Sequence, residues 1–166
     1  MKRQITSLLL IITVAGLFAG DQINFSGDWK FNEGKSTLDQ MGAQFIQSKM
    51  TVTQAENEMT VAKTVQGFDG SEMVMEEKLT LDGQACKSEF WNSPRVSTAD
   101  WSEKGDALSI SSLIKFEMDG QSNELDIKEV WTLSEDGKTL SIKHSSISNW
   151  GERNITMVFD RIEQGE

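Results

Sequence analysis

The stretch Gly27-Asp28-Trp29-Lys30-Phe31 decides how the rest of this 166-residue chain is interpreted. Side chains alternate between the two faces of a β-strand, so Trp29 and Phe31 share one face while Asp28 and Lys30 share the other. A large indole just after a glycine, ahead of a series of hairpins, suits a plug for one end of a β-barrel. We therefore predict that this stretch is the first strand of a barrel and that the following chain forms the wall.

The first 20 residues have the pattern of a signal peptide. Lys2 and Arg3 form a short positive segment, and an apolar run follows from Ile5 to Phe18. This run is shorter than the roughly 20 residues of a transmembrane helix. We expect residues 1–20 to be cleaved on export to the periplasm or out of the cell, and 21–166 to be one barrel domain with no stable membrane insertion after cleavage. An uncleaved anchor is the alternative.

Charge and cysteine content argue against several classes of partner. The formal net charge is −10, which disfavours nucleic acid and anionic membranes because both attract basic surfaces. Cys86 is the only cysteine, so packing rather than an intrachain disulfide must stabilise the domain. Cys86 and the only histidine, His144, lie on distant predicted strands and form no cluster of metal ligands. We expect no cofactor, no metal and no nucleic-acid partner, and the sequence leaves the oligomeric state open.

From residue 46 onward, strand-like segments alternate with turns. The Asx-Gly and Gly signals of tight hairpins recur at Asp69-Gly70, Asp82-Gly83, Gly105, Asp119-Gly120, Asp136-Gly137 and Gly151. The simplest account is an all-β protein, an antiparallel up-and-down meander barrel of about 8–10 strands. The segment 32–45 alternates little, and it holds either a short helix near Ser36-Met41, with Ser36 as the N-cap, or a loop.

The turns also fix strand registers, because a slip of one residue would turn the apolar face outward. The cross-strand partners predicted in this way are Val65 with Met73, Leu79 with Cys86, Met118 with Gln121, Leu133 with Leu140, Ser146 with Met157, and Trp150 with Arg153. The last pair, across a Gly151-Glu152 turn, is expected to stack. Most turns agree with the apolar alternation, and this agreement is the main support for the fold.

Three short motifs carry a resemblance to a known family. Gly27-Asp28-Trp29 resembles the Gly-X-Trp that opens lipocalin-like (calycin) barrels, and Arg161 resembles the basic residue that packs across that tryptophan where such barrels close. The phrase from Trp131 to Leu140 is similar to small exported bacterial proteins of this kind. About ten strands fit the fatty-acid-binding-like branch best. The resemblance implies that Trp29 and Arg161 close the barrel and that 32–45 stands where that branch has a helical lid.

The alternation also places polar side chains on the inward face of the predicted barrel. Unpaired charges are costly in a packed core, whereas a wet cavity tolerates them. We therefore expect a small-molecule pocket with an apolar wall and a few polar anchors, in which Lys63 or Arg153 holds a ligand carboxylate. The alternatives are that the charges pair with each other or face solvent at a bulge. The expected ligand-binding residues are Lys63, Glu77, Phe116, Glu129, Trp131, His144 and Arg153.

Three functions are compatible with these observations. The first is a non-enzymatic exported protein that binds a small, largely apolar or amphipathic ligand in the barrel lumen. The second is a structural or protein-interaction barrel with a filled core, marked by an exposed apolar patch near Trp91 and Trp101. The third is a small-barrel isomerase or dehydratase, because the predicted register sets Glu129 opposite His144 and a carboxylate can position an imidazole as a general base.

Overall fold

A computed structural model describes residues 22–39, 47–67, 70–118 and 120–163 of the chain. The predicted signal peptide lies outside these ranges, and so does the part of the expected lid segment from residue 40 onward. None of the helices within the described ranges has the length and the apolar character that a membrane crossing requires.

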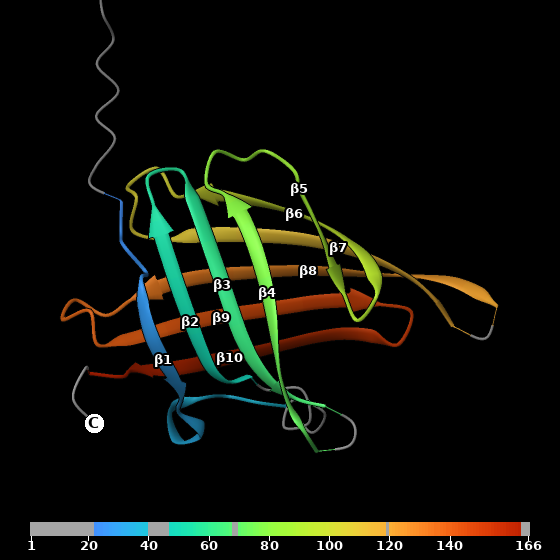
Figure 1. Ribbon diagram of the computed structural model, residues 1–166, viewed down its shortest axis with the longest axis horizontal. Coiled ribbons are helices and arrows are strands. Elements are labelled where there is room, and N and C mark those ends of the chain that lie inside the picture. Colours follow the sequence, from blue (N-terminus) through green and yellow to red (C-terminus); the bar gives the residue numbers. More distant parts are fainter. Residues whose placement is uncertain (1–21, 40–46, 68–69, 119, 164–166) are drawn as a thin grey trace, which may run out of the picture.

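Ten antiparallel strands form one sheet that curls into a nearly closed barrel (Figure 1), which confirms the predicted fold class. The sheet order is β4-β3-β2-β1-β10-β9-β8-β7-β6-β5, so the first strand lies in the middle of the sheet and pairs with the last. In Figure 1, β2, β3 and β4 cross in front of β8, β9 and β10 at a steep angle. The strands are β1 (Gly27–Phe31), β2 (Gln47–Ala55), β3 (Glu58–Gln66), β4 (Glu72–Thr80), β5 (Cys86–Phe90), β6 (Ser93–Trp101), β7 (Leu108–Met118), β8 (Gln121–Leu133), β9 (Thr139–Ser148) and β10 (Gly151–Arg161).

Three of the predicted hairpin registers are confirmed. The structure pairs Val65 with Met73, Met118 with Gln121, and Leu133 with Leu140. In each hairpin a glycine with positive φ shapes the turn, at +82° for Gly70, +73° for Gly120 and +68° for Gly137. Turn chemistry and the apolar alternation therefore select the same register in these hairpins.

The predicted turn at Gly151-Glu152 is wrong. The chain turns over Asn149-Trp150 instead, so Arg153 lies opposite Ser146 rather than opposite Trp150. Relative to the prediction, the partner of each residue moves by an even number of positions. Such a shift leaves the same side chains facing inward, and the apolar alternation cannot distinguish the two registers.

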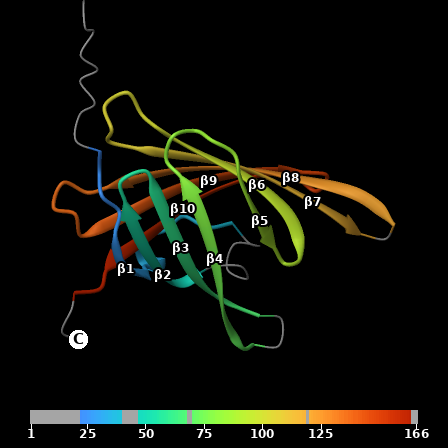
Figure 2. The same ribbon diagram turned by 45° about the horizontal axis from the view of Figure 1, so that its top comes forward.

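The predicted Asp82-Gly83 hairpin is also wrong, because β4 and β5 are the two edges of the sheet and do not form a ladder. Figures 1 and 2 show these strands splaying apart from the loop that joins them. The N–H of Gly83 donates to the carbonyl of Ala99 on β6 instead of bonding across a hairpin. Cys86 still touches β4, since its Sγ lies 3.2 Å from the backbone nitrogen of Thr80.

Of the two alternatives for the segment after β1, a short helix near Ser36-Met41 or a loop, the described residues 36–39 form no helix. A 3-10 helix, η1, spans Glu33–Lys35, and the side chain of Asn32 caps it by accepting a hydrogen bond from the Lys35 N–H at 3.1 Å. Ser36 follows this helix as its C-cap rather than starting a new one. The chain then runs beside β10, where Thr37 forms a bridge with Thr156.

The barrel is closed at one end as the resemblance implied. Trp29 is fully buried, and its indole N–H donates to the carbonyl of Phe25 at 3.1 Å. The guanidinium of Arg161 lies over the Trp29 ring, 4.2 Å from its centroid. The same guanidinium donates to the carbonyls of Ser26 and Gly137, both at 2.8 Å. One arginine thus links the first strand, the last strand and the β8–β9 loop.

The apolar core fills this end of the barrel. Phe25 packs between two indoles, with ring centroids 5.9 Å from Trp101 and 5.9 Å from Trp131. Trp101 is therefore partly buried against the core, whereas Trp91 lies just before the other end of β6. Eight strand residues, 93–100, lie between these two positions, and each adds about 3.3 Å. The two tryptophans therefore do not share one exposed apolar patch of the kind expected for an interaction barrel.

Candidate functional site

Next to the apolar core, the inward faces of several strands carry a layer of polar side chains. Lys63 on β3 and His144 on β9 belong to it, each with a side chain 15% exposed. The more deeply buried polar residues are Gln47, Glu77, Arg95, Ser97, Ser112, Asn123, Glu129 and Ser146. Hydrogen bonds and ion pairs divide much of this layer into two groups, which we call the Glu129 cluster (Lys63, Glu129, Trp131, His144) and the Glu77 cluster (Glu77, Arg95, Ser97, Ser112).

Glu129 is the centre of the first cluster. His144 lies opposite it across β8 and β9, as predicted, with its Nδ1 3.2 Å from Oε1 of the carboxylate. The indole N–H of Trp131 donates to the other oxygen, Oε2, at 3.0 Å. Lys63 approaches from β3, with its Nζ 3.8 Å from Oε2 and 5.9 Å from the centroid of the Trp131 ring. Three side chains from three strands therefore converge on one carboxylate.

The charge state of Glu129 follows from these neighbours. Burial alone would raise the pKa of its carboxyl group. The charge of Lys63, the contact with His144 and the indole N–H outweigh burial and hold this pKa well below its usual value. Glu129 is therefore an anion throughout the neutral pH range, and it can only accept hydrogen bonds.

The Glu77 cluster is closed on itself. Arg95 Nη2 lies 2.9 Å from Glu77 Oε2, and the Ser97 hydroxyl donates to the other carboxylate oxygen at 2.7 Å. Arg95 also donates to the hydroxyls of Ser97 at 3.1 Å and Ser112 at 2.8 Å. A buried ion pair offsets its desolvation only when further hydrogen bonds satisfy both partners. This pair meets that condition, so its charges need no ligand.

Sequence reasoning missed Arg95 and Ser97. On β6, Arg95 and Ser97 point inward while Val96 is 40% exposed. At the start of this strand, polar side chains therefore face the interior and an apolar side chain faces solvent, the reverse of the usual pattern. The loop before β7 is too long to fix a register by turn type. One signal was available. Pairing β6 with β7 from Trp101 and Leu108 outward sets Ser97 opposite Ser112, which shares a strand face with the apolar Ile110 and Ile114.

Arg153 and Phe116 lie apart from both clusters. Arg153 Nε donates to the carboxylate of Asp39 at 2.6 Å, in the segment that follows η1. Phe116 stacks on Trp150, with ring centroids 5.7 Å apart. Arg153 lies opposite Ser146, so the predicted cross-turn pair of Trp150 and Arg153 does not form. The seven residues predicted to bind ligand thus fall in separate places, with Lys63, Glu129, Trp131 and His144 brought together.

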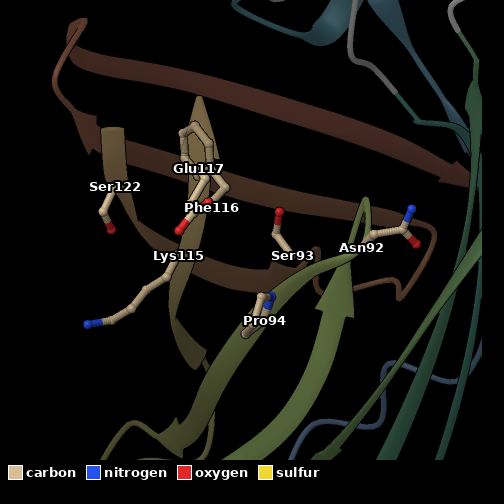
Figure 3. Close-up of a pocket in the computed structure, with 7 residues that line it drawn as sticks. All are labelled: Asn92, Ser93, Pro94, Lys115, Phe116, Glu117 and Ser122. Carbon is tan, nitrogen blue, oxygen red and sulfur yellow. The ribbon is translucent and has the colours of Figure 1, made fainter. Parts of the chain in front are cut away.

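Phe116 also lines an open pocket of about 360 Å³ at the end of the barrel away from Trp29. The pocket lies between the β5–β6 turn and the β7–β8 hairpin, and Figure 3 shows its lining side chains. Besides Phe116 they are Asn92, Ser93, Pro94, Lys115, Glu117 and Ser122. Of the predicted ligand-binding residues, Phe116 alone takes part in this pocket.

Lys63 and His144 keep unused hydrogen-bonding capacity. Within the part of the chain that the structure describes, neither the ammonium of Lys63 nor Nε2 of His144 makes a hydrogen bond, since the 3.8 Å approach to Glu129 is too long for one. Both side chains retain some solvent contact. Among the described residues, no group of three or more His, Cys, Asp and Glu side chains is suited to a metal ion.

Comparison with known proteins gives a match at the level of the fold. No family model matches the sequence, and no curated protein matches it. Among solved structures, the zebrafish ileal bile acid-binding protein in complex with cholic acid is similar, with a TM-score of 0.54 and 12% sequence identity. The alignment covers 83% of this chain and 98% of that one. The predicted resemblance is thereby confirmed in architecture, and the chain has the calycin fold of this bile acid-binding protein.

Proposed function

We propose that this protein is a non-enzymatic binding protein that holds a small, largely apolar ligand in the barrel lumen. The observation that carries the proposal is the Glu129 cluster, in which Lys63 and His144 face the interior with unused hydrogen-bonding capacity. A filled structural core would enclose such groups or pair them, as the Glu77 cluster does. The ligand's apolar body would lie against the core side chains, and its polar group would reach the cluster.

The similar solved structure supports the same role. The zebrafish protein is a bile acid-binding protein and was crystallised with cholic acid, an amphipathic molecule. One fold can serve many functions, so the fold supports a lumen ligand without identifying it. The Glu129 cluster supports a polar anchor for the ligand, and this support does not depend on the structural likeness.

Calorimetric and fluorescence titrations test the proposal. Trp131 donates to Glu129, so a ligand that engages the cluster should change tryptophan fluorescence saturably. We expect cholate or stearate to bind, and Lys63→Met to weaken binding about tenfold, as loss of one charge-assisted hydrogen bond implies. Lys143→Met, which removes an exposed lysine next to His144, is the matched control and should bind normally. A flat response to all amphiphiles with an intact fold would contradict the proposal.

We further propose that the protein is exported. The support is the charged and apolar pattern of residues 1–20. Expression of the full chain in a bacterium, followed by mass measurement of the protein from the periplasm and the medium, tests this. The expected product lacks about 20 N-terminal residues, and full-length protein confined to the cytoplasm would contradict the proposal.

A protein-interaction role is the second candidate, and a different observation favours it. Met118, Ile147 and Trp150 are more than half exposed near the β7–β8 and β9–β10 turns. Exposed apolar side chains that gather in one region often mark contact surfaces. If no amphiphile binds, while Trp150→Ser changes the mass of the protein measured by light scattering, this second role replaces the first.

A further inference from the structure

Glu129 determines which ring nitrogen of His144 carries the hydrogen. The carboxylate is ionised and can only accept, and its Oε1 lies 3.2 Å from Nδ1 of the imidazole. A neutral imidazole has one N–H and one bare nitrogen. The contact with Glu129 therefore selects the tautomer with hydrogen on Nδ1. Nε2 is left as a bare acceptor.

Lys63 places a donor beside the same carboxylate. Its ammonium has three N–H groups and no acceptor. Glu129 Oε2 lies 3.8 Å away, which is close enough for charge attraction but too far for a hydrogen bond. The Trp131 ring, 5.9 Å from Nζ, offers a second attraction to the charge without using an N–H group. Lys63 therefore retains its hydrogens for another acceptor.

From this arrangement we infer that the lumen selects ligands that carry a hydroxyl group on an otherwise apolar body. The hydroxyl donates its hydrogen to Nε2 of His144, and a ligand oxygen accepts from Nζ of Lys63. Glu129 is a positioning residue in this scheme, because it holds both partners and touches no ligand. The inference rests on the proposed function, since it names the class of ligand that the proposed lumen site takes.

The selectivity predicted here differs from a simple preference for acids. A carboxylate ligand without a hydroxyl can use Lys63 but offers no hydrogen to His144. A site built around a bare acceptor rejects the analogue that lacks the donor, because the acceptor is then left unpaired. The contrast between hydroxylated and plain amphiphiles of equal charge therefore isolates the contribution of His144.

Matched ligand pairs test the inference by calorimetry. Cholate and 5β-cholanate share one ring system and one carboxylate, and only cholate has hydroxyls on the rings. The pair 12-hydroxystearate and stearate makes the same comparison on a flexible chain. We expect the hydroxylated member of at least one pair to bind about tenfold more tightly. Equal affinities within both pairs would overturn the inference and leave the proposed function intact, whereas no binding of any of the four would refute the proposed function itself.

Two variants test whether the Glu129 cluster causes the preference for hydroxylated ligands. His144→Phe removes the acceptor. Glu129→Gln allows an amide N–H to donate to Nδ1, so the imidazole is no longer held in the tautomer with hydrogen on Nδ1. Each should reduce the hydroxyl preference to below threefold, while Lys143→Met should keep it. A full preference in folded His144→Phe would overturn the inference.

A spectroscopic measurement is independent of any variant's stability. His144 is the only histidine, so an untagged ¹⁵N-labelled chain gives one imidazole spin system. Long-range ¹H–¹⁵N correlation at pH 8 should report hydrogen on Nδ1 in the wild type. Hydrogen on Nε2 would overturn the inference, since Nε2 could not then accept. On binding of cholate, the Nε2 resonance should shift in the direction of hydrogen-bond acceptance.

Discussion

At the scale of single residues, Gly27 explains why a glycine precedes the tryptophan of β1 by two positions. Its φ is +145°, a backbone conformation that side chains with a Cβ rarely adopt. A Cβ at this position would collide with the Arg161 guanidinium, which covers the Trp29 ring. The Gly-X-Trp pattern therefore reflects the space that the closing arginine needs.

Gly27→Ala should destabilise the fold by about 2–4 kcal/mol, from backbone strain together with displacement of Arg161. Urea unfolding followed by tryptophan fluorescence measures this. Gly70→Ala is the control, because Gly70 also has positive φ (+82°) but open space where its Cβ would lie, and it should cost about 1 kcal/mol. Equal costs at the two positions would show that the arginine contact is not the cause.

Glu129 should control the acid stability of the protein. Its pKa in the folded state lies below the ordinary value of 4.5, so it contributes stability that is complete above about pH 4.5 and is lost as the pH falls toward the folded-state pKa. Glu129→Gln should lower stability at pH 7 by about 2 kcal/mol and flatten the decline below pH 4.5. Urea unfolding from pH 3 to 7 measures both effects. Glu124→Gln, in an exposed pair with Lys115, should change stability by less than about 0.5 kcal/mol.

At the scale of strands, the far ends of β7 and β8 form a two-stranded ribbon. β6 pairs with β7 only as far as Ile114, and β9 pairs with β8 only from Asp126 onward. The ribbon is tied to the β9–β10 turn by the stack of Phe116 on Trp150 and by a 2.7 Å hydrogen bond from Asn149 to Asn123. Its stability depends on these two contacts because isolated hairpins are marginal.

Trp150→Ser should therefore loosen the ribbon without unfolding the barrel. An aromatic pair contributes about 1 kcal/mol, which corresponds to roughly fivefold faster amide exchange in the ribbon. Hydrogen exchange measured by mass spectrometry should show the increase in peptides covering residues 115–125. Peptides from β2 and β3 should not change, and a global increase would contradict local tethering.

The same strands show what the sequence can predict. Registers were correct where a short glycine turn and an apolar alternation acted together, as at Met118 with Gln121. They failed where two registers keep the same faces, at β9–β10, and where neighbouring strands diverge, at β4–β5. The pair of Glu129 and His144 was predictable because one hairpin sets it. The approach of Lys63 was not, because it depends on how the whole sheet curls.

At the scale of the whole molecule, the interruption between β4 and β5 is the one break in the ladder of the ten strands described. The two edges come close at their joining loop, where Thr80 Oγ1 lies 3.5 Å from Cys86 Sγ. The break is thus narrow at one end, and Figure 2 shows it widening away from the loop.

A covalent bridge tests this geometry. Thr80→Cys, combined with the native Cys86, should oxidise to an intramolecular disulfide and stabilise the fold by about 2 kcal/mol. Loss of both free thiols and a higher unfolding midpoint than in the reduced form are the measurements. Met75→Cys, farther along β4 where the edges have diverged, should keep both thiols free. Bridging at both positions would show that the edges are closer than described.

The central position of β1 has a consequence for how the protein is made. The first strand cannot complete its pairing until the last strand has been synthesised. The reason is that β10 is one of the two neighbours of β1 and Arg161, on β10, covers Trp29. At a ribosomal rate of about 5–20 residues per second, roughly ten seconds pass between synthesis of the two strands. During that interval Arg161 does not yet cover Trp29, and one edge of β1 lacks its partner strand. Pairing of β10 with β1 and the arrival of Arg161 over Trp29 then end this interval.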